Sequence, residues 1–138
     1  MSDTIRIAIV VNPDLSLGFL ANTVGAIAIG LGARMPPLAG TRLGDRQGRT
    51  IDISANRPVP ILQADTDTLR SLTLKAIPHG PDLAVVAFPA FARSLHAFPD
   101  YEQAFPERDL STETIDGLGL AGPEKLVKSL TGFLKLLR

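Results

Sequence analysis

Polar side chains that can hold a ligand occur in two stretches of an otherwise aliphatic chain. The first stretch contains Asn12 and Asp14, with Asn22 and Thr23 following further along, and the second contains Arg93. A guanidinium can bind an anion through two parallel hydrogen bonds, and amide, hydroxyl and carboxylate groups can orient a polar molecule. The sequence therefore predicts that Asn12, Asp14, Asn22, Thr23 and Arg93 bind a small ligand.

These residue types also have structural roles, so a second interpretation stays open. Asn12 and Asp14 flank a proline, and both residue types favour turns. Asn22 can satisfy a buried backbone group, and an arginine such as Arg93 is most often solvated at the surface. The sequence alone does not separate the binding role from the structural role.

Three further residues, Ser94, His96 and Asp100, have the side chains of a hydrolytic triad. A triad is defined by its geometry in space, and three residues this close in sequence rarely converge in that way. The catalytic residues are therefore left unassigned. With two histidines and no cysteine, we expect no metal site, and no motif in the sequence indicates a cofactor.

Two elements at the start of the chain must position the first group of polar residues. Residues 5–11 form a run rich in Ile and Val, which predicts a strand covered on both faces. Residues 15–33 carry no charge and predict a helix that is apolar nearly all round and therefore buried on most of its surface. In open α/β sheets, ligands bind at the carboxyl ends of strands beside helix N-termini, which is where the turn at Asn12 falls.

That uncharged helix is also about long enough to cross a bilayer. Asn22, Thr23 and four glycines lower its hydrophobicity, and no basic cluster precedes it. We therefore expect no membrane association.

The rest of the chain predicts further strands and helices in an α/β order. Strands are expected over 58–63, 83–87 and 114–121, and either a small hairpin or a surface loop over 38–53. Helices are expected after Asp65 or Thr66, from Pro89 to a stop at Pro99 with a further turn of helix over 101–105, and from Pro123 to Gly132. The apolar tail at 133–137 must pack on something. Together these segments predict one α/β domain over residues 1–138, with a small mixed sheet of about four strands flanked by helices.

Composition limits the functional class. The 138 residues are 45% hydrophobic, which supports a real core, and 14 basic residues balance 14 acidic ones. Zero net charge argues against a nucleic-acid partner. A tRNA would be a partner only if the protein were an esterase that acts on peptidyl-tRNA. The absence of cysteine fits a cytoplasmic protein. The apolar helix and tail predict a homodimer, because exposed apolar patches usually have partners.

Both ends of the chain resemble known families. Gly122-Pro123, a short helix and then Thr131-Gly132-Phe133-Leu134-Lys135-Leu136 are similar to the C-terminal signature of type II peptidyl-tRNA hydrolases. Asn12-Pro13-Asp14-Leu15-Ser16-Leu17-Gly18, followed by Ala21-Asn22-Thr23, resembles a bacterial family of unknown function, DUF2000, which is thought to share the hydrolase fold. The resemblance implies a hydrolase-like α/β scaffold.

The departures from the hydrolase pattern decide which function we expect. The hydrolases carry lysines at the start of the first helix and Asp-Ala-Gly after the third strand, whereas this chain has Gly18-Phe19-Leu20-Ala21 and Phe88-Pro89-Ala90 there. The lysine would stabilise a phosphate or oxyanion, and the aspartate would activate water. We therefore expect a small-ligand-binding or regulatory protein, with an esterase acting on peptidyl-tRNA or a related ester as the alternative.

Overall fold

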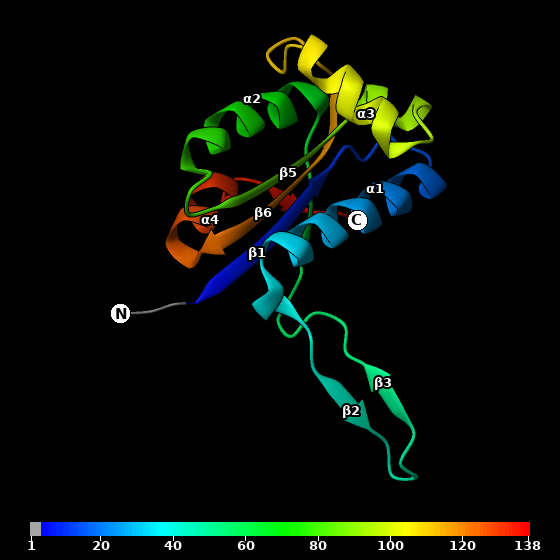
Figure 1. Cartoon of the computed structure of the whole chain (residues 1–138). Coiled ribbons are helices and arrows are strands. Elements are labelled where there is room, and N and C mark those ends of the chain that lie inside the picture. Colours follow the sequence, from blue (N-terminus) through cyan, green and yellow to red (C-terminus); the bar gives the residue numbers. More distant parts are fainter. Residues whose placement is uncertain (1–3) are drawn as a thin grey trace.

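The computed structural model describes residues 4–138 and contains a five-stranded mixed sheet in the order β5-β6-β1-β4-β7 (Figure 1). The central strand β1 (Ile5–Val11) pairs antiparallel with β6 (Ile115–Pro123) and parallel with β4 (Ile61–Gln63). On the outer edges, β5 (Ala84–Pro89) runs antiparallel to β6, and β7 (Lys135–Leu136) runs antiparallel to β4. The mixed α/β sheet is as predicted, but with five strands and not four, because the apolar tail pairs with the free edge of β4.

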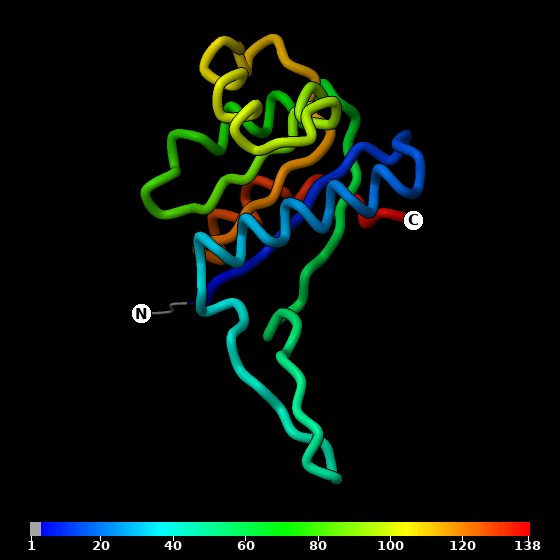
Figure 2. The backbone as a smooth tube through the Cα atoms, turned by 45° about the vertical axis from the view of Figure 1, so that its right-hand side comes forward, coloured from blue at the N-terminus to red at the C-terminus, as the bar shows by residue number. Residues whose placement is uncertain are grey.

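Side chains of the central strands alternate between two cores, one on each face of the sheet. Ala8 and Val10 point to one face, where α2 (Thr66–Ala76) and α4 (Glu124–Thr131) supply Leu69, Leu72, Val127 and Leu130. Ile7, Ile9 and Val11 point to the other face, which α1 (Leu17–Arg34) covers with Ile27 and Leu31. The helices therefore form one layer on each side of the sheet (Figures 1 and 2).

Glycines in β6 let α1 approach the sheet closely. A Cβ added at Gly117 would lie 2.6 Å from Thr23 Cγ2, and one at Gly119 would overlap Ile27. Gly117 and Gly119 are therefore required in β6 because larger side chains there would overlap α1.

The prediction that α1 is buried on most of its surface is wrong. Only Thr23, Ile27 and Leu31 are buried, whereas Leu17 is 83% exposed and Ile29 is 75% exposed. One face of the helix covers the sheet, and nothing in the described chain covers the other. By length and composition alone this helix is apolar enough to cross a membrane. Its buried residues instead dock it flat against the sheet.

The segment predicted as a hairpin or a loop is a hairpin, formed by β2 (Arg42–Gly44) and β3 (Thr50–Asp52). It makes a separate two-stranded sheet that projects from the body beyond the C-terminal end of α1 (Figures 1 and 2). At its tip the Asp45 carboxylate accepts hydrogen bonds from the backbone N–H groups of Gln47 and Arg49, and Gly48 adopts a φ of +82°. We call residues 39–56 the arm.

Short helices connect the remaining strands. The turns η1 (Pro36–Leu38), η2 (Ile77–His79) and η4 (Phe105–Glu107) each follow an α-helix, and η3 (Ala90–Ser94) follows β5. The predicted helix from Pro89 to a stop at Pro99 is wrong, because only the short η3 lies there and α3 (Phe98–Ala104) begins where that helix was expected to end. The further turn of helix expected over 101–105 is confirmed, because α3 and η4 cover it. Pro99 lies in the first turn of α3, where a proline costs no hydrogen bond.

Candidate functional site

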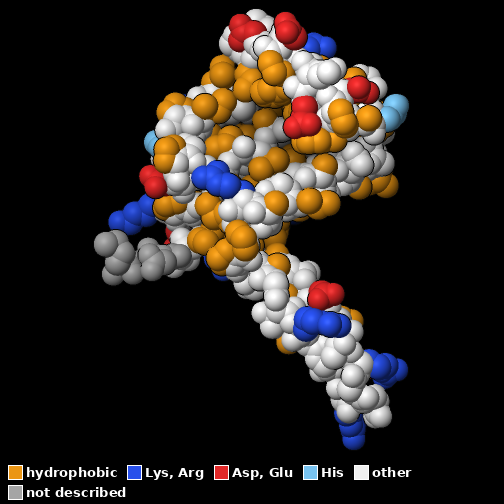
Figure 3. Space-filling view, viewed as in Figure 1, with side chains coloured by type: hydrophobic (Ala, Val, Ile, Leu, Met, Phe, Trp, Pro, Cys, Tyr) orange, Lys and Arg blue, Asp and Glu red, His pale blue; other side chains and the backbone are white. Residues whose placement is uncertain are grey.

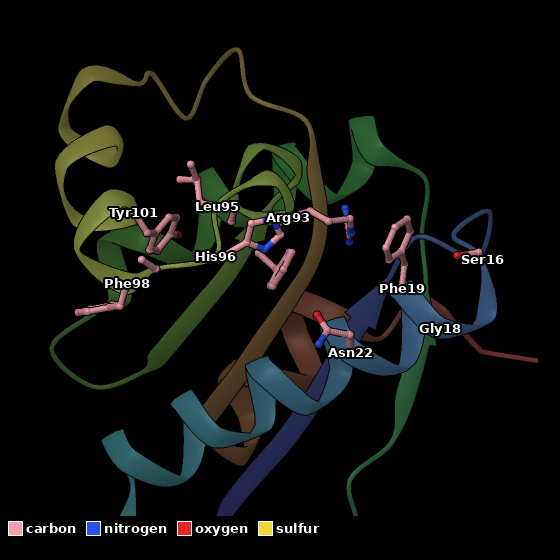
Figure 4. Close-up of a pocket in the computed structure, with 12 residues that line it drawn as sticks. Ser16, Gly18, Phe19, Asn22, Arg93, Leu95, His96, Phe98 and Tyr101 are labelled. Carbon is pink, nitrogen blue, oxygen red and sulfur yellow. The ribbon is translucent and has the colours of Figure 1, made fainter.

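An open pocket of about 780 Å³ lies between the N-terminal half of α1, the end of β5 and α3 (Figure 4). Its apolar lining includes four aromatic rings, and its polar lining comes from a serine, an asparagine, an arginine and a histidine. The lining residues are Ser16, Gly18, Phe19, Asn22, Phe88, Ala92, Arg93, Leu95, His96, Ala97, Phe98 and Tyr101. The site is therefore mostly apolar with a few polar groups, as small-molecule pockets usually are.

Arg93 is the most constrained side chain of this pocket. Its Nη1 donates to Asp116 Oδ2 at 2.6 Å, and its Nη2 donates to Thr23 Oγ1 at 3.0 Å. The guanidinium carbon lies 4.8 Å from the centre of the Phe19 ring and 5.2 Å from that of Phe88, close enough for cation–π attraction. Figure 4 shows the Arg93 side chain reaching across β6 toward Phe19. The arginine is thus held in one orientation beside the pocket.

The carboxylate that pairs with Arg93 comes from the sheet. Asp116 lies in β6 with its side chain only 6% exposed, and Arg93 is 18% exposed. The backbone carbonyl of Asp116 also accepts the N–H of Asn12, which ties the end of β1 to the same position. A buried carboxylate needs a cation beside it, so Asp116 determines where the guanidinium lies.

One donor of Arg93 remains without a partner. Its Nε is buried and makes no hydrogen bond in the part of the chain that the structure describes. A buried donor left unpaired costs free energy, and such groups in folded proteins call for an explanation such as a bound molecule.

Aromatic residues form the wall opposite α1. Phe91, Tyr101 and Phe105 pack on one another with ring centres 5.7 to 6.4 Å apart. Burial within this cluster raises the pKa of the Tyr101 hydroxyl above its usual value. Phe98 projects from the start of α3 and is largely exposed (Figure 4). Tyr101 and Phe98 therefore line the pocket on this side, and Phe91 and Phe105 pack on Tyr101 from outside the lining.

The three residues with triad-type side chains do not form a triad at the pocket. No aspartate, glutamate or lysine is among its lining residues. His96 lines it, but no hydrogen bond joins this histidine to a neighbouring side chain over residues 4–138, and the Ser94 hydroxyl donates instead to the Phe91 carbonyl at 2.9 Å. Ser94, His96 and Asp100 therefore make no triad here. The described residues also contain no cluster of three groups that could hold a metal ion.

The structure brings three of the five predicted ligand-binding residues together. Asn22 and Arg93 both line the pocket, and Thr23 is buried behind them with its hydroxyl bonded to Arg93. Asn12 and Asp14 do not line it. The Asn12 side chain accepts the backbone N–H of Asp14 at 3.0 Å, which is the turn-forming role that the sequence left open.

Sequence reasoning missed Asp116, Phe19 and Phe88. One signal was present for Asp116, because it is the only charged residue in the apolar strand Ile115–Pro123 and must be paired if that strand is buried. No comparable signal marks Phe19 or Phe88, since aromatic residues in apolar segments normally serve the core.

Fold and site together define a class of protein. This is a three-layered mixed α/β domain, with helices on both faces of the sheet, and its mostly apolar pocket lies beside the start of α1 at the carboxyl end of the edge strand β5.

Comparison with known proteins gives the family. The family model described as "Protein of unknown function (DUF2000)" matches residues 5–138, so the chain belongs to the DUF2000 family, as its opening motif predicted. A solved structure of a protein of unknown function from Agrobacterium tumefaciens is similar over 99% of this chain and 98% of that one, with a TM-score of 0.88 and 19% identity. No curated protein matches. The likeness to the solved structure establishes a shared fold.

Proposed function

We propose that this chain is a small-molecule-binding protein, on a scaffold similar to type II peptidyl-tRNA hydrolases but without their chemistry. The observation that carries the proposal is Arg93, which is fixed by Asp116, Thr23 and two phenylalanine rings and keeps a buried Nε without an acceptor. A preorganised donor beside an apolar pocket favours binding, because little conformational freedom is lost when the ligand arrives.

The lining indicates the kind of ligand. The charge of Arg93 is already balanced by Asp116, so the site does not need an anion. The rings of Phe19, Phe88 and Tyr101 suit a flat molecule, and the Asn22 amide and the Arg93 donors suit a carbonyl oxygen. We therefore propose a planar ligand that carries a neutral hydrogen-bond acceptor.

The absence of lining carboxylates and lysines supports binding over hydrolysis. A general base needs a pKa matched to its task and a partner that orients it, and His96 has no such partner among residues 4–138. The esterase alternative has a direct test in the hydrolysis of N-blocked aminoacyl-tRNA, with a type II hydrolase as the positive control. Turnover at a rate comparable to the control would overturn a function limited to binding.

The binding proposal is tested with benzamide as a planar probe that bears a carbonyl. Chemical shifts of the Arg93 Nε–H and of the Asn22 side-chain amide are followed by NMR during titration. Cyclohexanecarboxamide has the same amide without a flat ring, and toluene has the flat ring without an acceptor. We expect saturable shifts with benzamide at a Kd on the order of 1 mM, which corresponds to about 4 kcal/mol, and weaker effects with the other two compounds.

Two variants locate the binding site. Phe19→Ala removes one ring against Arg93, and it should weaken benzamide binding about two- to tenfold, since an aromatic contact contributes roughly 0.5–1.5 kcal/mol beyond its area. Leu17→Ala is the matched control, because Leu17 is exposed on the same helix and does not line the pocket. Equal binding of all three compounds, or shifts that ignore Phe19→Ala, would refute the proposal.

A further inference from the structure

The outward face of α1 carries an unusual row of small residues. Gly18, Ala21, Gly25, Ala28 and Gly32 alternate at spacings of three and four, which places them along one side of the helix. A Cβ added at Gly18, Gly25 or Gly32 would meet nothing within 4 Å. These three glycines therefore have open space above them, and the two ends of the row also border cavities, Gly18 at the candidate pocket and Gly32 beside Leu38 and Val59.

Large apolar side chains border this row, and no charge interrupts it. Leu17 and Ile29 are among the most exposed apolar residues of the molecule, and no charged residue occurs in α1 before Arg34. Arg34 itself turns back to the body, where it donates to the carbonyls of Gly80 and Leu83. A contiguous apolar face of this size usually marks an interaction surface.

The arm gives a second, independent indication. A lone two-stranded hairpin is marginally stable in water, yet the principal contacts of β2 and β3 are with each other. Leu43 and Ile51 are directly paired across the two strands, so they share one face of the arm, and they are 56% and 65% exposed. The arm therefore presents an apolar surface that nothing in its own chain covers.

We propose that this chain forms a two-fold symmetric homodimer, in which the α1 helices pack antiparallel through the small-residue row and each arm lies on the α3 end of the partner. The proposal does not rest on the proposed function. A second copy of the chain is the expected partner because the small-residue row of α1 is self-complementary, as a two-fold interface requires. Gly25 is its midpoint, so a dyad there places Gly18 opposite Gly32 of the partner subunit and Ala21 opposite Ala28 of the partner subunit.

The charges of the arm and of the α3 end support this arrangement. The arm (39–56) has three arginines and two aspartates, so that Arg46 is its unbalanced charge, whereas residues 98–113 contain five carboxylates and one arginine. Figure 3 shows acidic side chains gathered at the α3 end and basic ones along the arm. The arm leaves α1 at its C-terminal end, and α3 lies near its N-terminal end (Figure 1). Antiparallel helices bring these opposite charges together, and the partner's arm then lies near the mouth of the pocket.

The area that a dimer would bury reaches that of a stable interface only if both the α1 helix and the arm take part. An 18-residue helix is about 27 Å long and presents a face of roughly 270 Å². Helix packing alone therefore falls short of the roughly 800 Å² per partner of a standard interface. The underside of an arm about 25 Å long, and the surface that the partner's arm covers, each add about 250 Å² and bring the total close to that value.

A lipid surface is the other candidate occupant of this face. Helices that lie in a membrane interface combine large apolar residues with a lysine-rich or arginine-rich polar face. The α1 helix has small residues instead and contains no lysine. A second copy is therefore the better match.

The first test is the mass in solution of the full chain and of Gly25→Leu, measured by analytical ultracentrifugation from 1 to 100 µM. We expect the wild type to sediment at twice 14.7 kDa. Gly25→Leu should weaken the dimer at least 100-fold, because the added side chain has free space in the monomer and stands at the dyad of the dimer. Ser129→Leu, which adds the same side chain to the exposed surface of α4, is the matched control and should remain dimeric.

A second measurement covers the case in which Gly25→Leu does not fold. The chain has no cysteine, so Gly25→Cys introduces a single thiol at the proposed dyad. Mild oxidation should convert most of Gly25→Cys to a covalent dimer, and Ser129→Cys should form no disulfide cross-link under the same conditions. A wild type that is monomeric at 100 µM would overturn the proposal. It would also be overturned if Gly25→Leu left the affinity of the dimer unchanged and Gly25→Cys failed to cross-link. Flotation of the wild type with vesicles of phosphatidylcholine and phosphatidylglycerol, retained or strengthened in Gly25→Leu, would assign the face to a membrane instead, because the added leucine enlarges the apolar surface of the helix.

Discussion

Replacement of Asp116 by asparagine tests whether the Arg93–Asp116 ion pair is shielded from solvent, as the structure shows. The substitution keeps the size of the side chain and removes its charge, which leaves the guanidinium largely buried without a counter-ion. Arg93 Nη1 and Asp116 Oδ2 lie 2.6 Å apart, and both side chains are mostly buried. Breaking such a buried pair from one side costs about 3–5 kcal/mol.

The size of this loss makes it easy to measure. A domain of this kind has a free energy of unfolding of roughly 5–15 kcal/mol, so Asp116→Asn should still fold but with much of its stability gone. With a urea m-value of about 2 kcal/mol/M, a loss of 4 kcal/mol moves the unfolding midpoint by about 2 M. Circular dichroism in the far ultraviolet follows the transition in a chain that has no tryptophan.

The double variant Arg93→Met with Asp116→Leu separates the ion pair from its surroundings. Replacing both partners by apolar side chains of similar volume leaves no uncompensated charge, so we expect its stability to lie within about 1 kcal/mol of the wild type or above it. A loss below 1 kcal/mol in Asp116→Asn would refute the reasoning, because it would mean that solvent already screens the pair. A double variant that loses the sum of the two single losses would refute it as well.

Further predictions concern packing, capping and titration. Gly119→Ala should lower the unfolding free energy by about 1–3 kcal/mol, because its Cβ overlaps α1. Gly25→Ala should raise the unfolding free energy of the monomer by about 0.5–1 kcal/mol, and equal signs in urea unfolding of dilute protein would contradict this. The pKa of Asp65 is lowered by the hydrogen bond from the Thr68 N–H at the start of α2, so its stabilising contribution is present above the unfolded pKa and is lost as the pH falls through the lower folded pKa. Melting curves of Asp65→Ala should therefore converge on the wild type in acid. Burial raises the pKa of Tyr101, the only tyrosine, so ultraviolet titration should show ionisation above pH 10 that shifts to lower pH in urea, and stability should fall as the pH rises through that range.

The sequence predicted the elements of the sheet well because their signals are local. The Ile- and Val-rich run of β1, the Asp65 cap of α2 and the Thr131-Gly132 stop of α4 each depend on a few neighbouring residues. The family resemblance likewise rested on short motifs, and the family model matches nearly the whole chain. The two-residue strand β7 was missed because a pairing so short leaves no periodicity to detect.

The candidate site was predictable only in part. Arg93 and Asn22 were identified by residue type, but the partner of Arg93 lies 23 positions away in a different element. Whether an arginine is solvated or buried depends on what the fold brings beside it, and the carboxylate of Asp116 and the ring of Phe19 reach it only through tertiary packing. Burial and charge pairing are therefore properties of the assembled sheet.

The exposed face of α1 shows the same division between sequence and tertiary structure. The amino-acid sequence by itself determined that this helix is apolar nearly all round, and an apolar helix predicts burial. Only the tertiary structure decided that the five-stranded sheet covers one side of α1, through Thr23, Ile27 and Leu31, and that the small-residue row lies on the opposite side, away from the sheet. The physical reason is that hydrophobicity makes a surface favourable to bury without specifying whether its own chain or another molecule will cover it.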